Sequence, residues 1–161
     1  MRYRKLSLEE LKPLDKEFID FLVVNGVSAK DWTVIKTKNP KQADKILDAF
    51  SEVIFEGILR KTLYLTYQSS IEIFTFSCTK EKIYLAGIRY EGNRAKELGV
   101  DFCNVNFIES ILDRTPSGIK IFIDEKPYME VREDEMFRMI EQGCNISDGK
   151  LFKAISLASV D

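Results

Sequence analysis

The sequence predicts an α+β fold in which N-terminal helices pack on an antiparallel sheet of three to five strands, followed by two C-terminal helices. Up to Lys61, apolar residues recur three or four positions apart, which is the spacing of one helical face. From Thr62 to Tyr90, β-branched and aromatic residues instead form short runs separated by polar links, as in a meander of strands. A length of 161 residues is typical of one domain, so we expect a single globular domain over residues 1–161.

Two helices are predicted before residue 39, and each begins at a capping box. In such a box the first residue's side chain accepts a hydrogen bond from the backbone of the fourth residue, and the fourth side chain accepts one in return. Ser7 with Glu10 begins a helix from about Leu8 to Val24, and Pro13 near its first turns allows a start closer to Lys12. The same signature at Ser28 begins a shorter helix over Ala29–Thr37.

The longest predicted helix covers Pro40–Lys61. Asn39 can cap its first turn, and Pro40 suits the first helical position because its missing N–H would have no partner there. One face is apolar and consists of Ala43, Ile46, Leu47, Phe50, Val53, Ile54 and Ile58. Phe55 and Leu59 extend this stripe until the second half is apolar almost all round. We therefore expect this helix to be the buried spine of the fold.

Three charged residues on the long helix are the weak catalytic candidates of this sequence, namely Glu52, Glu56 and Arg60. They follow one another at intervals of four, so they lie along one line of the helix. A partly buried carboxylate pair could serve acid–base chemistry. A simple ladder of charges would instead stabilise the helix by a few tenths of a kcal/mol per pair. Structural ion pairs are the commoner cause of such clusters, so no catalytic residue is assigned beyond these three candidates.

Three strands are predicted directly after this helix, over Thr62–Gln68, Ile71–Cys78 and Lys82–Tyr90. Alternation places Leu63, Leu65, Ile71, Ile73, Ile83 and Leu85 in one set and Tyr64, Phe74, Phe76, Tyr84 and Tyr90 in the other. Exposed aromatic residues on a sheet stack bases in some RNA-binding modules. The acidic pI of about 5.4 counts against a nucleic-acid partner, so we expect helices to cover the aromatic set. The strand register, which decides whether each set shares a face, is not set by the sequence.

The rest of the chain is predicted to contain one more helix, one or two more strands and a helical C-terminus. After a polar connection over Glu91–Gly99, the expected elements are a helix over Phe107–Arg114, a strand over Ile119–Ile123, a turn over Asp124–Pro127, a short edge strand over Tyr128–Val131, and helices over about Glu133–Gln142 and Gly149–Ala158, the last capped by Ser147. The acidic residues between Asp124 and Glu135 could bind a hard cation, but they lack EF-hand spacing and also suit the start of a helix.

Several classes of function are disfavoured by what the sequence lacks. It has no histidine, which removes serine and cysteine nucleophiles that depend on histidine and most zinc sites. It has neither a phosphate-binding glycine loop nor a CxxC motif, so we expect no cofactor and no metal. The net charge of −2 argues against a nucleic-acid partner. No apolar run is long enough for a membrane span, and three scattered cysteines suit a reducing compartment, so we expect a cytoplasmic protein.

Three stretches of the chain resemble a family of short bacterial proteins known only as a domain of unknown function. They are the opening RYRKLSLEEL with EFIDFLVVNG, the central ADKILDAFSEVIFEGILRKTLYL and the closing MFRMIEQGCNISDGKLFKAI. The resemblance implies a single cytoplasmic domain. It implies no activity, substrate or catalytic residue.

Three functions remain open at the level of sequence. The first is a non-catalytic cytoplasmic module that binds a protein partner not identified by the sequence. The second is a small enzyme or small-molecule binder that uses the carboxylates of Glu52 and Glu56 with Arg60. The third is a single-stranded nucleic-acid binder that uses the aromatic sheet face, and helices covering Phe74 and Phe76 would remove it.

Overall fold

The longest helix, α4 (Pro40–Lys61), has the bounds that the sequence predicts. Phe50 and Ala43 on its apolar stripe are buried, as expected. The expectation that this helix is a buried spine is wrong at two positions of its second half, because Val53 is 54% exposed and Ile58 is 44% exposed.

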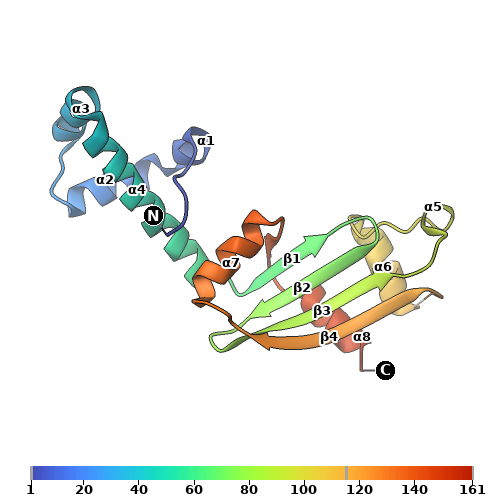
Figure 1. Ribbon diagram of the computed structural model, residues 1–161. Coiled ribbons are helices and arrows are strands. Elements are labelled where there is room, and N and C mark those ends of the chain that lie inside the picture. The colour runs from blue at the N-terminus through green and yellow to red at the C-terminus, as the bar shows by residue number, and fades with distance from the viewer. Residues whose placement is uncertain (1, 115, 161) are drawn as a thin grey trace. The chain divides into compact units, whose positions relative to one another are not determined.

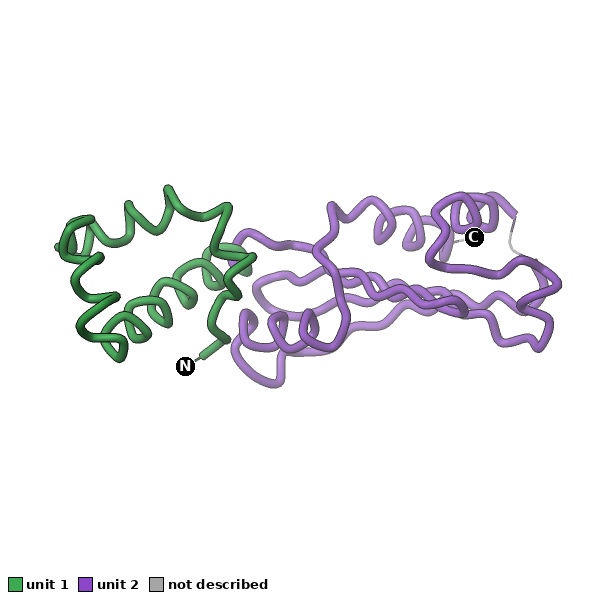
Figure 2. The backbone as a smooth tube through the Cα atoms, turned by 90° about the horizontal axis from the view of Figure 1, so that it is seen from above, with its two compact units in different colours: residues 1–59 green, residues 60–161 purple. Residues whose placement is uncertain are grey.

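A computed structural model describes residues 2–114 and 116–160, and the chain divides into two compact units, Met1–Leu59 and Arg60–Asp161 (Figure 2). The first unit is helical, and the second holds the sheet (Figure 1). The boundary falls near the end of α4, so the last turn of that helix belongs to the second unit. The single domain expected over residues 1–161 stays a prediction.

The first unit consists of α1 (Leu8–Leu11), a 3₁₀ turn (Lys12–Leu14), α2 (Asp15–Val24), α3 (Ala29–Lys38) and most of α4. Both capping boxes are present, at Ser7 and at Ser28. The continuous helix expected from Leu8 to Val24 is wrong: it is interrupted at Pro13, which has no N–H to donate to the preceding turn.

Aromatic side chains form the centre of the first unit. The ring of Phe18 lies 5.0 Å from the rings of both Trp32 and Phe50, and Phe21 lies 5.4 Å from Phe50. Edge-to-face contacts of this kind add about 0.5–1.5 kcal/mol each beyond the burial of apolar area. These four rings join α2, α3 and α4 to one another.

The second unit contains an antiparallel five-stranded sheet in the order β4-β3-β2-β1-β5. Its strands are β1 (Tyr64–Gln68), β2 (Glu72–Cys78), β3 (Lys82–Tyr90), β4 (Ile119–Pro127) and β5 (Asn145–Ser147). The α+β class with an antiparallel sheet after N-terminal helices is thereby confirmed. The short strand β5 lies in a segment where the sequence predicts only a link between helices.

Strand β4 differs from its prediction at its C-terminal end. The turn expected over Asp124–Pro127 and the edge strand expected over Tyr128–Val131 are both wrong, because β4 continues to Pro127 and the next four residues form no strand. Pairing with β3 along its whole length, from Tyr90 opposite Ile119 to Lys82 opposite Pro127, outweighs the local preference of these residues for a turn.

The helices of the second unit are α5 (Ala95–Leu98), α6 (Val105–Asp113), α7 (Arg132–Glu141) and α8 (Lys150–Ala158). The helix predicted from Phe107 begins earlier because Asn104, rather than Asn106, accepts the capping hydrogen bond. The helix α5 lies in the segment predicted as a polar connection. The cap of α8 is Gly149, not Ser147, whose hydroxyl accepts a hydrogen bond from the N–H of Gly149 instead.

The two faces of the sheet are covered differently (Figure 1). Helices α6 and α8 pack on one face and form the core there with β2, β3 and the segment before α6. The buried residues of this core are Ile73, Ala86, Ile88, Tyr90, Phe102, Ile108, Ile111 and Ile155. Helix α7 lies on the opposite face, at the end where β2 finishes and β3 begins (Figures 1 and 2).

Candidate functional site

The open face is the part of the sheet that faces away from α6 and α8 and extends beyond α7. Its apolar side chains are half-buried, and they are Tyr67, Phe74, Phe76, Leu85 and Phe122. The register places them together, since Tyr67 is opposite Phe74 and Phe76 is opposite Leu85. The turn after α7 reaches this face at Tyr67, where a Cβ added at Gly143 would lie 3.7 Å from the ring. Phe74 and Phe76 instead line open depressions, so the expectation that helices cover them is wrong.

The register also corrects the predicted aromatic set. Phe74 and Phe76 share the open face with Leu85, whereas Tyr84 and Tyr90 lie on the face that α6 and α8 cover. Tyr64 also lies on the covered face, where its ring is 5.7 Å from that of Phe152 in α8. The rings of the open face come from β1, β2 and β4.

A glycine makes room for the central ring of the open face. A Cβ added at Gly87 would lie 2.6 Å from Cδ1 of Phe74, which is closer than carbon atoms can approach. The ring of Phe74 therefore lies directly against the backbone of β3. The ring of Tyr67 stacks beside it, with centroids 6.3 Å apart and an interplanar angle of 19°.

One arginine lies among these rings. The guanidinium carbon of Arg89 is 5.4 Å from the ring centroids of both Phe74 and Phe122, within the range of cation–π attraction. Its Nε donates a hydrogen bond of 2.7 Å to Oε2 of Glu72 on the neighbouring strand. The arginine charge is thus balanced by a carboxylate and held in position by two aromatic rings.

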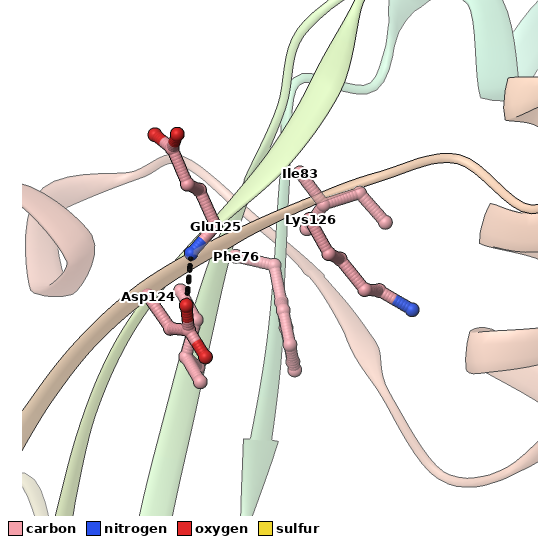
Figure 3. Close-up of a pocket in the computed structure, with 6 residues that line it drawn as sticks. Phe76, Ile83, Asp124, Glu125 and Lys126 are labelled. Carbon is pink, nitrogen blue, oxygen red and sulfur yellow. Dashed lines mark hydrogen bonds between the residues drawn. The ribbon is translucent and has the colours of Figure 1, made fainter.

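Shallow depressions lie beside the rings. A small pocket of about 90 Å³ is lined by Phe76, Ile83, Leu85, Asp124, Glu125 and Lys126 (Figure 3). At its rim, Oδ1 of Asp124 accepts a hydrogen bond from the N–H of Glu125 (Figure 3). Sites that enclose a drug-sized ligand have volumes of roughly 300–1,000 Å³, so this pocket suits a single side chain better than a substrate.

The end of this face under α7 is held by a partly buried arginine. Arg132 of α7 donates hydrogen bonds to the carbonyl oxygens of Thr62 and Cys78, at 2.5 Å and 3.0 Å from Nη2. The buried carboxylate of Glu135 pairs with Nζ of Lys126 at 2.9 Å and accepts a hydrogen bond from the N–H of Met129. These bonds attach α7 to β2 and β4.

Two thiols and one phenol near α7 have a raised pKa. Burial raises the pKa of the Cys78 thiol to about 12, and it also raises the pKa of Cys144. Burial likewise raises the pKa of Tyr128 to about 12, and its hydroxyl donates to the carbonyl oxygen of Thr79. A thiol held protonated is a poor nucleophile, so Cys78 and Cys144 act here as packed apolar groups.

The structure gives structural contacts to all three catalytic candidates. Glu52 accepts a hydrogen bond from the backbone N–H of Arg2, and Glu56 accepts hydrogen bonds from Arg2 Nη1 and the Tyr3 hydroxyl. Both carboxylates thus hold the N-terminal segment against α4. Arg60 instead lines a depression that includes Cys78. A catalytic role for these residues stays a prediction.

Sequence reasoning missed Gly87, Arg89 and Phe122. Phe122 was visible as the aromatic member of the predicted strand over Ile119–Ile123, but its neighbours depend on strand order and register. No signal in the sequence pairs Arg89 with Glu72 across two strands.

Two general features of the described residues bear on ligands and membranes. They contain no group of three or more His, Cys, Asp or Glu side chains arranged to hold a metal ion. None of the helices formed by these residues is long and apolar enough to cross a membrane. The cytoplasmic location expected from the sequence stays a prediction.

Comparison with known proteins yields one match. A model of a family of unknown function (DUF6495) matches residues 1–159. No curated protein and no solved structure matches the chain.

Proposed function

The chain belongs to this family of unknown function, DUF6495, as the resemblance of its sequence indicates, and we propose that it is a non-catalytic module that binds another protein through the open face. The partner's contact segment would present apolar or aromatic side chains to Phe74, Phe76 and Leu85. The small pocket beside Phe76 would accept one of them.

One observation supports this proposal above all. Five large apolar side chains of the open face stay half-buried on a sheet whose opposite face forms the core with α6 and α8. Contiguous exposed apolar surface commonly marks an interaction site in a soluble protein. Aromatic residues and arginine, such as Phe74 and Arg89, are also the types enriched at the centre of protein interfaces.

The charges around the open face favour a protein partner over a nucleic acid. Three basic residues (Arg89, Lys120 and Lys126) are accompanied by two acidic ones (Glu72 and Asp124), and Glu72 pairs with Arg89. Nucleic-acid binding draws its affinity from a surplus of positive charge that neutralises phosphates. A mixed rim instead suits a partner that carries both signs of charge.

Binding of a single-stranded nucleic acid through the open face is the second candidate function. The stacked rings of Tyr67 and Phe74, with Arg89 beside them, offer the flat surfaces on which bases stack. This candidate differs from the first in its salt dependence, because release of counterions from phosphates makes nucleic-acid affinity fall steeply with salt.

The proposal is tested by altering the open face at strand β2. The variants are Phe74→Ser and Phe76→Ser, with Met129→Ser as the control, because Met129 is 87% exposed and lies outside the open face. We expect a partner that co-purifies in stoichiometric amount with the unaltered protein and the control, and is lost with both variants. Binding of that purified partner, measured by calorimetry, should weaken at least about tenfold, the equivalent of about 1.4 kcal/mol.

Two results decide between the candidates. A partner held equally by the variants and the control would overturn the proposal. Binding of a 20-nucleotide single strand, measured by fluorescence anisotropy and lost with Phe74→Ser, would replace it with the second candidate. Circular dichroism of each variant establishes that the fold is retained.

A further inference from the structure

The strand β4 is an edge of the sheet with one side unpaired. It pairs with β3 along nine residues, and among the described residues no strand lies on its other side. An edge of this kind presents a row of backbone N–H and C=O groups that can pair with another strand. Proteins shield such edges with bulges, very short strands, charged side chains or covering elements. Strand β4 pairs residue for residue with β3 over nine residues, and its charged side chains carry both signs.

Apolar side chains continue along β4 on both faces. Phe122 belongs to the open face, and Ile123 on the opposite face is 56% exposed. A depression beside β4 on that opposite face is lined by Leu112, Ile119, Ile121, Ile123 and Ala158, together with polar residues. A strand added at this edge would cover apolar surface as well as satisfy the backbone.

We propose that β4 pairs with β4 of a second copy of this chain, in an antiparallel register centred on Phe122. The two sheets would join into one about a two-fold axis perpendicular to them, so the open faces of both copies would lie side by side. Such closed two-fold dimers are the commonest form of soluble oligomer. This inference does not rest on the proposed function, because a monomer would keep its own open face.

The charges of β4 select this register. With Phe122 opposite itself, Lys120 of each copy faces Asp124 of the other, and Ile121 faces Ile123. Two ion pairs and apolar contacts on both faces then form at once, and opposite charges directly across strands are favourable. Within one chain, Nζ of Lys120 lies 3.4 Å from Oε2 of Glu91, and both side chains are largely exposed. An exposed ion pair contributes little stability, so Lys120 can leave Glu91 for Asp124 of the second copy at little cost.

The neighbouring registers are less favourable. A register centred on Ile123 places Lys120 opposite Lys126, and one centred on Asp124 places two aspartates opposite each other, and like charges across strands repel. A register centred on Ile121 leaves Lys120 opposite Phe122 and forms no ion pair. Lys120 and Asp124 therefore disfavour two neighbouring registers and favour the one centred on Phe122.

Charge reversal tests the proposal. Sedimentation velocity over a concentration series to several hundred micromolar should show a species of twice the 18.6 kDa chain mass. Lys120→Asp alone and Asp124→Lys alone should each raise the dissociation constant by about tenfold or more, since both symmetric ion pairs become repulsive. The double reversal restores the pairing and should recover the dimer. Lys80→Asp, an equal change of charge at an exposed turn residue, should leave it unchanged.

The register is tested by disulfide trapping in a Cys103→Ser background, which removes the exposed native thiol. Phe122→Cys should form a cross-linked dimer on mild oxidation, because paired residues lie within the roughly 4.4–6.8 Å that a disulfide spans. Lys120→Cys should not, since the two copies would lie roughly 13 Å apart at about 3.3 Å per residue.

Three results would overturn the proposal. The first is a protein that remains monomeric at every concentration. The second is a dimer that weakens equally with each single reversal and with Lys80→Asp. The third is a double-reversal variant that stays monomeric although its circular dichroism matches that of the unaltered protein. A loss of partner binding in Phe74→Ser leaves this inference untouched, because that residue lies two strands away from β4.

Discussion

Phe74 lies so close to Gly87 that a Cβ at position 87 would be 2.6 Å from its ring. The glycine therefore fixes the position of the central aromatic side chain of the open face. Gly87→Ala should displace the Phe74 ring and destabilise the protein by about 1–3 kcal/mol, the usual cost of overfilling a packed site. Thermal and urea denaturation measure the change, and it should be accompanied by loss of the ring-current shifts of Phe74 in NMR spectra.

Gly57 in α4 is the matched control for this substitution, because a Cβ added there meets nothing within 4 Å. Gly57→Ala should stabilise the protein by about 0.5–1 kcal/mol, since glycine in a helix loses more backbone entropy on folding than alanine. Equal effects of the two substitutions on unfolding would show that the contact between Gly87 and Phe74 has no energetic weight.

Arg132 should be essential for holding α7 on the sheet. Its side chain donates to the carbonyl oxygens of Thr62 and Cys78, and its removal leaves these acceptors without this partner. Arg132→Met should lower the free energy of unfolding by about 2–3 kcal/mol, as expected for bonds to a charged group. Hydrogen exchange should show the greatest loss of protection in α7. Arg138→Met, at an exposed position of the same helix, should change stability by less than about 0.5 kcal/mol.

The first capping box should make stability depend on pH in the acid range. The hydrogen bond from Arg4, followed by that from the backbone of Ser7, lowers the pKa of Glu10 from 4.5 to about 2. A carboxylate with a depressed pKa stabilises the fold above its unfolded pKa, and this contribution is lost as pH falls towards 2. Glu10→Gln should therefore be less stable than the unaltered protein at pH 6. The difference should shrink between about pH 4.5 and pH 2 in parallel denaturation curves. A difference that stays constant over this range would contradict the assignment.

The three cysteines should differ sharply in reactivity. Cys103 is exposed, whereas Cys78 and Cys144 are buried, and burial raises the pKa of both buried thiols. Because the thiolate is the reactive form, Ellman's reagent at pH 8 should modify Cys103 rapidly in the native protein and the other two only after unfolding. Cys103→Ser should abolish the rapid phase. Rapid native labelling of Cys78 would show that α7 opens readily.

The sequence predicts well those elements that are decided by local spacing. The bounds of α4 and β3 follow from strong periodicity, and the capping boxes at Ser7 and Ser28 form because they involve only neighbouring residues. The C-terminal half of β4 was not predictable in this way. Its residues favour a turn locally, and only pairing with β3 makes them a strand.

The open face was harder to predict from the sequence than these elements. Which side of the sheet exposes Phe74 depends on strand register and on where α6, α7 and α8 pack, and both are set by contacts distant in sequence. The alternation of residues identified the two sides of each strand, but it could not assign Tyr84 and Phe76 to different faces. The candidate catalytic residues of α4 were easier to notice because helical spacing alone brings Glu52 and Glu56 together.

The ion pair between Glu72 and Arg89 also determines what the open face can discriminate. A carboxylate already occupies the guanidinium edge at Nε, so an isolated acidic side chain arriving from outside must displace Glu72 and gains little by doing so. A flat hydrocarbon ring meets no such competitor. Beside Arg89, selectivity therefore depends on the shape of the incoming group more than on a negative charge.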